Sequence, residues 1–90
     1  MTFDFKDFKT LLMETGITVQ EAAKIFRTTR PTIYHWLKGT GPNQEVLLQF
    51  ALRQIGVIKK ALAAGDLPLS VDVESTDRLA CVYGVMRKHL

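Results

Sequence analysis

The chain has 90 residues, of which 47% are hydrophobic and 23% are charged, and its formal net charge is +3. This length suits one small domain over residues 1–90, with a hydrophobic core of modest size. Neither a membrane-length apolar run nor a basic start followed by an apolar stretch occurs, so we expect no membrane segment and no secretion signal. Cys81 is the single cysteine, which excludes a disulfide within the chain and favours a reducing, cytoplasmic compartment. We expect its side chain to be a small, buried apolar group.

The first predicted helix has an N-cap at Thr2 or Asp4 and runs to about Thr15. Apolar residues recur along it at helical spacing, and Gly16 follows, which favours a stop at that point. We expect this helix to brace the two helices that follow it and to complete a three-helix unit over residues 1–40. Its expected inner face consists of Phe5, Phe8, Leu11 and Leu12.

Two short helices joined by a tight turn are expected over residues 18–39. Thr18 and Glu21 have the spacing of a capping box, in which each side chain accepts a hydrogen bond from the other residue's backbone, so a helix should begin there. This helix has a narrow apolar face whose small side chains permit a close crossing with its neighbour. The face consists of Ala22, Ala23 and Phe26.

The second short helix is expected to start at an N-cap provided by Thr29. Pro31 lies in its first turn, where the missing N–H costs little, and Gly39 can end the helix in a left-handed conformation. Three apolar residues have the spacing of an inward face. These residues are Ile33, Trp36 and Leu37. The residues left to point outward are Arg30, Thr32, Tyr34, His35 and Lys38.

This part of the chain resembles the helix-turn-helix of Cro and lambda-repressor-like regulators. Ala23, Ile33 and Trp36 match the buried anchor positions of that motif. The run over residues 22–37 also looks like the related motif of resolvases and transposases. The resemblance implies a helix-turn-helix fold that binds DNA, in a phage or another mobile element, within the bacterial or phage-infected cytoplasm.

The turn between the two short helices departs from the family pattern. Arg27 stands where the family usually has glycine, and Thr28 stands where it usually has an apolar residue. A non-glycine residue held at positive φ costs on the order of 1 kcal/mol. We therefore expect a slightly remodelled turn. An alternative register with Ala22 as the anchor would put Phe26 in the turn and Thr32 in the core, which fits less well.

A Gly-Thr-Gly-Pro break at residues 39–42 separates the three-helix unit from the rest of the chain. A long helix is then expected from about residue 43 to residue 64, closed by Gly65. Its apolar residues cover well over half of the circumference, which is more than a surface helix of a monomer needs. We therefore expect this helix to be covered on two sides, by the C-terminal segment, by a second subunit, or by both.

Residues 67–73 alternate apolar and polar side chains, which is a strand period, and Pro68 limits such a strand to an edge or an end position. No partner strand is evident in the sequence. Two arrangements stay open: pairing with the same segment of a twofold mate, or an extended segment that lies on the core without ladder hydrogen bonds. A last helix is expected from Ser75 or Thr76 to about His89. The apolar face of this helix consists of Leu79, Val82, Tyr83, Met86 and Leu90.

Positive charge concentrates on the two short helices, since residues 24–38 contain four basic residues and no acid. This is the electrostatic footprint expected of a DNA-binding surface. Arg30 is the best candidate for a base contact, because a guanidinium can bind guanine O6 and N7 together, and a solvated arginine is the alternative. The other candidates suit contacts to base edges, thymine methyl groups or phosphates. The predicted DNA-contacting residues are Thr18, Gln20, Arg27, Thr29, Arg30, Thr32, Tyr34, His35 and Lys38.

Residues 43–90 are expected to join two subunits through the long helix, the extended segment and the last helix. A homodimer doubles the number of base contacts on a pseudo-palindromic site whose halves lie about one helical turn apart. The predicted interface residues are Phe50, Val57, Leu67, Leu69, Val71, Val73, Leu79, Tyr83 and Met86.

The sequence thus predicts a mainly α-helical bundle of about five helices that binds double-stranded DNA as a transcriptional regulator, in the form of a dimeric repressor. Two alternatives stay open: a DNA packaging or recombination accessory protein with the same fold, and a protein-binding module that has kept the helix-turn-helix shape. His35 and His89 lie in different elements, and the sequence has neither a metal-ligand spacing nor a glycine-rich phosphate loop. We therefore expect no enzyme activity, no metal, no cofactor and no small-molecule ligand.

Overall fold

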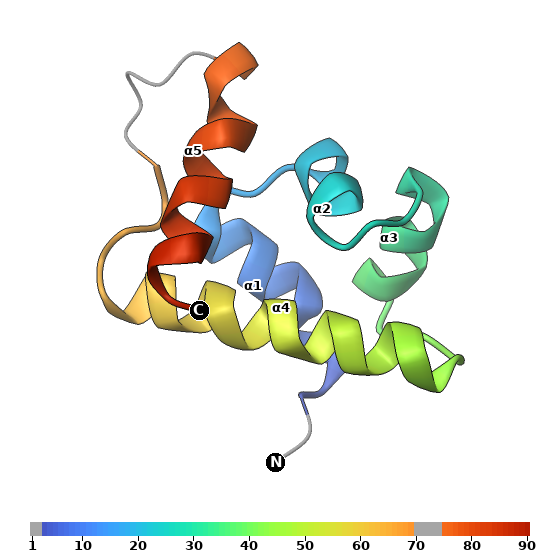
Figure 1. Ribbon diagram of the computed structural model, residues 1–90. Helices are drawn as coiled ribbons and strands as arrows, with labels where there is room; N and C mark the ends of the chain where they lie inside the picture. The colour runs from blue at the N-terminus through green and yellow to red at the C-terminus, as the bar shows by residue number, and fades with distance from the viewer. Residues whose placement is uncertain (1–2, 70–74) are drawn as a thin grey trace.

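The computed structural model describes residues 3–69 and 75–90. Within these residues the chain forms five α-helices and one short 3-10 helix, and it forms no strand (Figure 1). This architecture confirms the prediction of a mainly α-helical bundle. The elements in chain order are η1 (Phe5–Asp7), α1 (Phe8–Thr15), α2 (Val19–Ile25), α3 (Arg30–Leu37), α4 (Glu45–Ala63) and α5 (Ser75–Lys88).

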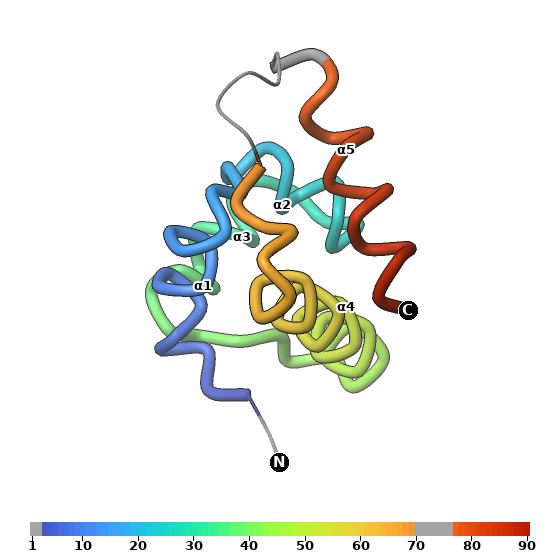
Figure 2. Tube along the Cα trace, turned by 90° about the vertical axis from the view of Figure 1, so that its left-hand side faces the viewer, coloured from blue at the N-terminus to red at the C-terminus, as the bar shows by residue number. Residues whose placement is uncertain are grey.

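The other helices are arranged around the long helix α4. α2 and α3 lie together toward one end of the molecule, and α5 runs across α4 toward the other end (Figure 1). Figure 2, which looks along α4, shows α1 on one side of this helix and α5 on the other, and both pairs are in contact. The predicted two-sided cover of α4 is therefore supplied within one chain, with the C-terminal helix as the second cover. The start of α4 is less covered, and the side chain of Val46 is 83% exposed.

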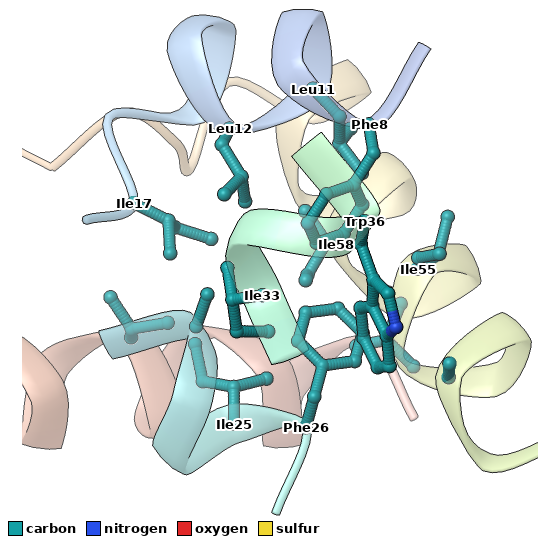
Figure 3. Close-up of a cluster of buried hydrophobic side chains, with 14 of the residues drawn as sticks. Phe8, Leu11, Leu12, Ile17, Ile25, Phe26, Ile33, Trp36, Ile55 and Ile58 are labelled. Atoms are coloured by element: carbon teal, nitrogen blue, oxygen red, sulfur yellow. The ribbon is translucent and has the colours of Figure 1, made fainter. Parts of the chain in front are cut away.

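Four aromatic rings form the centre of the core, and three of them are labelled in Figure 3. Their centroids lie 5.4–5.8 Å apart, and most of the pairs meet edge to face. Such pairs contribute about 0.5–1.5 kcal/mol each beyond the area that they bury. The rings come from η1, α1, the end of α2 and α3, so the cluster fixes the first three helices against one another. The rings are those of Phe5, Phe8, Phe26 and Trp36.

The local sequence patterns that define the first three helices have the predicted geometry. The Thr18 side chain accepts a hydrogen bond from the Glu21 backbone N–H, and the Glu21 carboxylate accepts one from the Thr18 N–H, so the capping box is complete. Gly16 ends α1 at φ 69°. Asp4 caps the 3-10 helix by accepting from the Lys6 N–H, so the first helix begins as a 3-10 turn. The three anchor residues Ala23, Ile33 and Trp36 are all buried.

The predicted helices of the C-terminal half agree with the structure to within two residues at each end. α4 begins at Glu45, where residue 43 was expected, and α5 begins at Ser75 and ends at Lys88. Two arrangements were left open for residues 67–73, and the described part, residues 67–69, forms no strand and places Leu67 in the core, where it is 2% exposed. The rest of that segment, residues 70–74, lies outside the described residues.

Two side chains of the last segment are less buried than predicted. Cys81 is half-buried, because it sits at the edge of the inward face of α5, one position before the fully buried Val82. Leu90 is 81% exposed, since it follows the end of α5 and is not carried on the inward face. Two contacts hold this end of the chain: the His89 ring lies 2.7 Å from Asp66 Oδ2, and the Lys88 ammonium lies 3.4 Å from it.

Candidate nucleic-acid interface

The helix α3 presents one face to the core and the opposite face to solvent. Ile33 and Trp36 are 0% and 2% exposed, whereas Tyr34 on the other side of the helix is 54% exposed. Thr32 and Leu37 are half-buried at the boundary. The exposed side chains of this face, with the capping residue before the helix and the residue after it, are Thr29, Arg30, Tyr34, His35 and Lys38.

The start of α3 is fixed by its own sequence. The Thr29 hydroxyl accepts a hydrogen bond from the Thr32 N–H at 3.4 Å, and Pro31 occupies the first turn, as predicted. The two threonine hydroxyls also lie 3.0 Å apart. Because the capping geometry fixes this first turn, Arg30 at the first helical position projects from an ordered helix end.

The packing of α2 against α3 sets the direction in which the exposed face points. Ala22 and Ala23 are 0% and 7% exposed in α2, which is in extensive contact with α3. Their methyl groups let the two helix backbones approach closely. At the start of α2, Thr18 and Gln20 are exposed beside the capping box. The Thr18 hydroxyl accepts from the Glu21 N–H at 3.1 Å and keeps its own proton for a further hydrogen bond.

Arg27 occupies the turn between α2 and α3 with a left-handed backbone, at φ 53°. It is the non-glycine residue at positive φ that the departure from the family pattern predicted. Its guanidinium lies 5.3 Å from the centroid of the Phe50 ring on α4, so the side chain reaches toward α4. It borders a hollow of about 380 Å³ that also has Lys24, Tyr83 and Arg87 in its lining.

Arg78 of α5 binds the carboxylate of Glu21 in the first turn of α2. Its Nε lies 3.0 Å from Oε2, and its Nη2 donates to the Gly16 carbonyl at 2.7 Å. Burial opposes ionisation of Glu21, but the hydrogen bonds from Arg78 and Thr18 outweigh it, so the pKa of this carboxyl is held below its ordinary value. Glu21 therefore stays ionised within the helix-turn-helix.

A family model described as Transposase, for the helix-turn-helix domain of the IS630 group, matches residues 3–63. The chain belongs to this family. Comparisons with curated proteins and with solved structures gave no significant match. Of the two resemblances in the sequence, the match supports the helix-turn-helix class in its transposase form and does not extend to the Cro and lambda-repressor type.

The matched residues of this IS630-type helix-turn-helix run from just before η1 to the last residue of α4, so α5 lies outside the family match. In the described residues no helix is long and apolar enough to cross a membrane. Residues 3–69 and 75–90 contain no cluster of three or more histidine, cysteine, aspartate or glutamate side chains arranged to hold a metal.

The IS630-type domain has three polar residues near α3 that the sequence patterns did not select, namely Thr40, Asn43 and Gln44. Together with the predicted contact residue His35, they line a hollow of about 400 Å³ between α3 and the start of α4. The polar run after the Gly-Pro break, directly before a long helix, was the signal that could have identified Asn43 and Gln44. Arg78 had no such signal, because it lies 57 residues from Glu21 in the sequence.

The residues predicted at the dimer interface differ in how far the single chain buries them. Val57, Leu67 and Met86 are 6%, 2% and 5% exposed, so the single chain already buries these three side chains, and their part in a subunit interface stays a prediction. Tyr83 is 36% exposed. Val71 and Val73 lie outside the described residues. The half-buried members of the set are Phe50, Leu69 and Leu79.

Proposed function

We propose that this chain binds double-stranded DNA in a sequence-specific manner, with α3 in the major groove. The observation that carries the proposal is the solvent-exposed face of α3, which presents basic, aromatic and hydroxyl groups on a helix without a carboxylate. An α-helix of this kind fits the major groove, where each base pair presents a distinct pattern of donors and acceptors. Membership of a helix-turn-helix transposase family supports the same function.

The proposal assigns different roles to the residues of this face. Arg30, at the start of α3, binds guanine O6 and N7, and Tyr34 and His35 contact base edges or a thymine methyl one turn further on. The remaining polar residues contact phosphates and fix the position of α3 in the groove. To contact a phosphate, the Arg27 guanidinium has to move away from the ring of Phe50. The phosphate-contacting set is Thr18, Gln20, Arg27, Thr29, Thr32 and Lys38.

Selection of bound sequences from random DNA tests the proposal directly. A defined consensus is expected, with an affinity that falls as salt rises, since phosphate contacts release counterions. Arg30→Ala should weaken binding to the consensus by about 1–3 kcal/mol and relax the preference at one position. Arg53→Ala, which removes the same charge from an exposed site on α4, is the matched control and should bind nearly as the parent does. Equal losses on consensus and random DNA would reduce Arg30 to a phosphate contact.

We also propose that the chain forms a homodimer, which represses transcription by occupying a pseudo-palindromic operator. Among the described members of the predicted interface, Tyr83 is partly exposed and Phe50, Leu69 and Leu79 are half-buried, so these four side chains have surface available to a second subunit. Tyr83→Glu is expected to convert the dimer into a monomer at micromolar concentration, because a charge would be buried in the contact. A parent protein that already sediments as a monomer would remove the dimer from the proposal.

Recombination is the second role, and the transposase family match favours it. In that role the domain holds a protein assembly on the DNA that is rearranged, and higher-order assembly on DNA is expected in place of a simple twofold complex. A chain that shows no salt-dependent DNA binding would instead be a protein-binding module with the helix-turn-helix shape. Both DNA roles take place in the bacterial or phage-infected cytoplasm and assign no catalytic step to this chain.

A further inference from the structure

The contact between α5 and the helix-turn-helix joins charged groups in a partly buried setting. Glu21 is 8% exposed, and the Arg78 side chain is 22% exposed. Besides the 3.0 Å contact from Nε to Oε2, Nη2 lies 3.4 Å from Oε1, so the guanidinium faces both carboxylate oxygens. The same Nη2 also donates to the Gly16 carbonyl, which fixes the guanidinium at the junction of α1 and α2.

Glu21 is the only acidic residue between Thr18 and Lys38. Its part in the capping box requires a hydrogen-bond acceptor and not a charge, since glutamine serves equally at this position. Its Oε1 lies 3.0 Å from the backbone nitrogen of Thr18, which belongs to the proposed phosphate-contacting set. An uncompensated carboxylate at this place would repel the phosphates that the rest of the surface attracts.

We infer that Arg78 is a positioning residue for DNA binding, which neutralises Glu21 so that no unpaired carboxylate lies beside the phosphate-contacting start of α2. The inference rests on the proposed function. Arg78 lies on α5, beyond the residues that match the family, so this chain adds the neutralising group from outside the shared domain. DNA affinity then depends on the docking of α5, although none of the proposed DNA-contacting residues lies on that helix.

The test is a double-mutant cycle with Arg78→Gln, Glu21→Gln and the double variant, each bound to a duplex carrying the selected consensus and to a random duplex. Arg78→Gln should weaken binding to both duplexes about two- to fivefold at low salt, because the unpaired carboxylate repels phosphates without regard to sequence. The double variant should recover the affinity of the parent, since the Glu21→Gln substitution keeps the cap and removes the charge. Glu21→Gln alone should bind at least as tightly as the parent.

Two further variants separate charge from structure. Arg78→Lys keeps the charge and loses the two-pronged hydrogen bonding, so it should retain most of the affinity. Lys88→Gln makes the same charge change at the far end of α5 and should leave DNA binding nearly unchanged. Thermal unfolding of each variant establishes that it is folded under the binding conditions.

The possible outcomes are distinct. Recovery in the double variant supports neutralisation. A double variant as weak as Arg78→Gln would show that Arg78 acts only by holding the fold, and an Arg78→Gln variant that binds like the parent would show no role; either result overturns the inference while the proposed function stands. A parent chain that binds neither duplex would overturn the proposed function, and the inference with it.

Discussion

The positive φ of Arg27 costs free energy, and the contact of its side chain with Phe50 stabilises the fold. Replacing Arg27 by glycine and by alanine measures these two contributions separately. At φ 53° a side chain costs about 1–2 kcal/mol of strain. The guanidinium above the Phe50 ring, 5.3 Å from its centroid, returns about 0.5–1 kcal/mol. Alanine loses the ring contact and keeps the strain. Glycine loses the contact and relieves the strain, although its freedom in the unfolded chain offsets about 0.4–1 kcal/mol of that gain.

The expected order of stability follows from these values. Arg27→Ala should be about 0.5–1 kcal/mol less stable than the parent, and Arg27→Gly should lie close to the parent. The glycine variant should therefore unfold at a temperature roughly 2–8 °C above that of the alanine variant. Urea unfolding gives the same comparison as a free energy, with the fluorescence of the buried Trp36 as the probe.

The matched control is the same pair of substitutions at Arg53, an exposed position inside α4. There the backbone is helical, so glycine should be less stable than alanine by about 1 kcal/mol, and the order of the two variants is reversed. If glycine is also the less stable residue at position 27, the turn stores no such backbone strain and the prediction is refuted.

The remaining predictions concern packing and acid stability. Gly41→Ala should destabilise the fold by about 1–3 kcal/mol, because the new Cβ would lie 2.7 Å from the buried Phe5 ring. Gly56→Ala, with no neighbouring atom within 4 Å, should be neutral or slightly stabilising, and equal unfolding temperatures for the two variants would contradict the close contact. The pKa of Glu21 lies below its ordinary 4.5, and the hydrogen bond from His89 holds the pKa of Asp66 below its ordinary 3.8. The folded state therefore binds protons less readily than the unfolded chain. The contribution of these two carboxylates to the free energy of unfolding should be complete above about pH 4.5, and it should be lost as the pH falls through the folded pKa values. Urea titrations across this range should show a weaker acid dependence for Glu21→Gln, and an unchanged dependence would remove Glu21 as a cause.

The first three helices were predictable because their determinants are local. The capping box at Thr18 and Glu21 and the N-cap at Thr29 satisfy backbone groups a few residues away, and the stop at Gly16 depends on its own φ. The inward residues of α3 repeat at helical spacing, so the outward face could be listed as well. Such features depend on which residues follow one another and are therefore present in the sequence.

The C-terminal half was predicted less well, because the alternation over residues 67–73 is a weak pattern that tertiary packing can override. Leu67, Val57 and Met86, which were predicted at a subunit contact, are buried within the single chain. Periodicity indicates that a face is apolar, but it does not say what covers that face.

The sequence alone determined the helical class, the capped helix-turn-helix and the composition of the exposed face of α3, since each depends on neighbours a few positions apart. Only the folded chain decided that α5 covers α4, that Arg27 reaches Phe50 and that Arg78 meets Glu21 across 57 residues. Contacts between residues so far apart in the sequence have no local pattern, because they arise when whole helices dock and bring their side chains together.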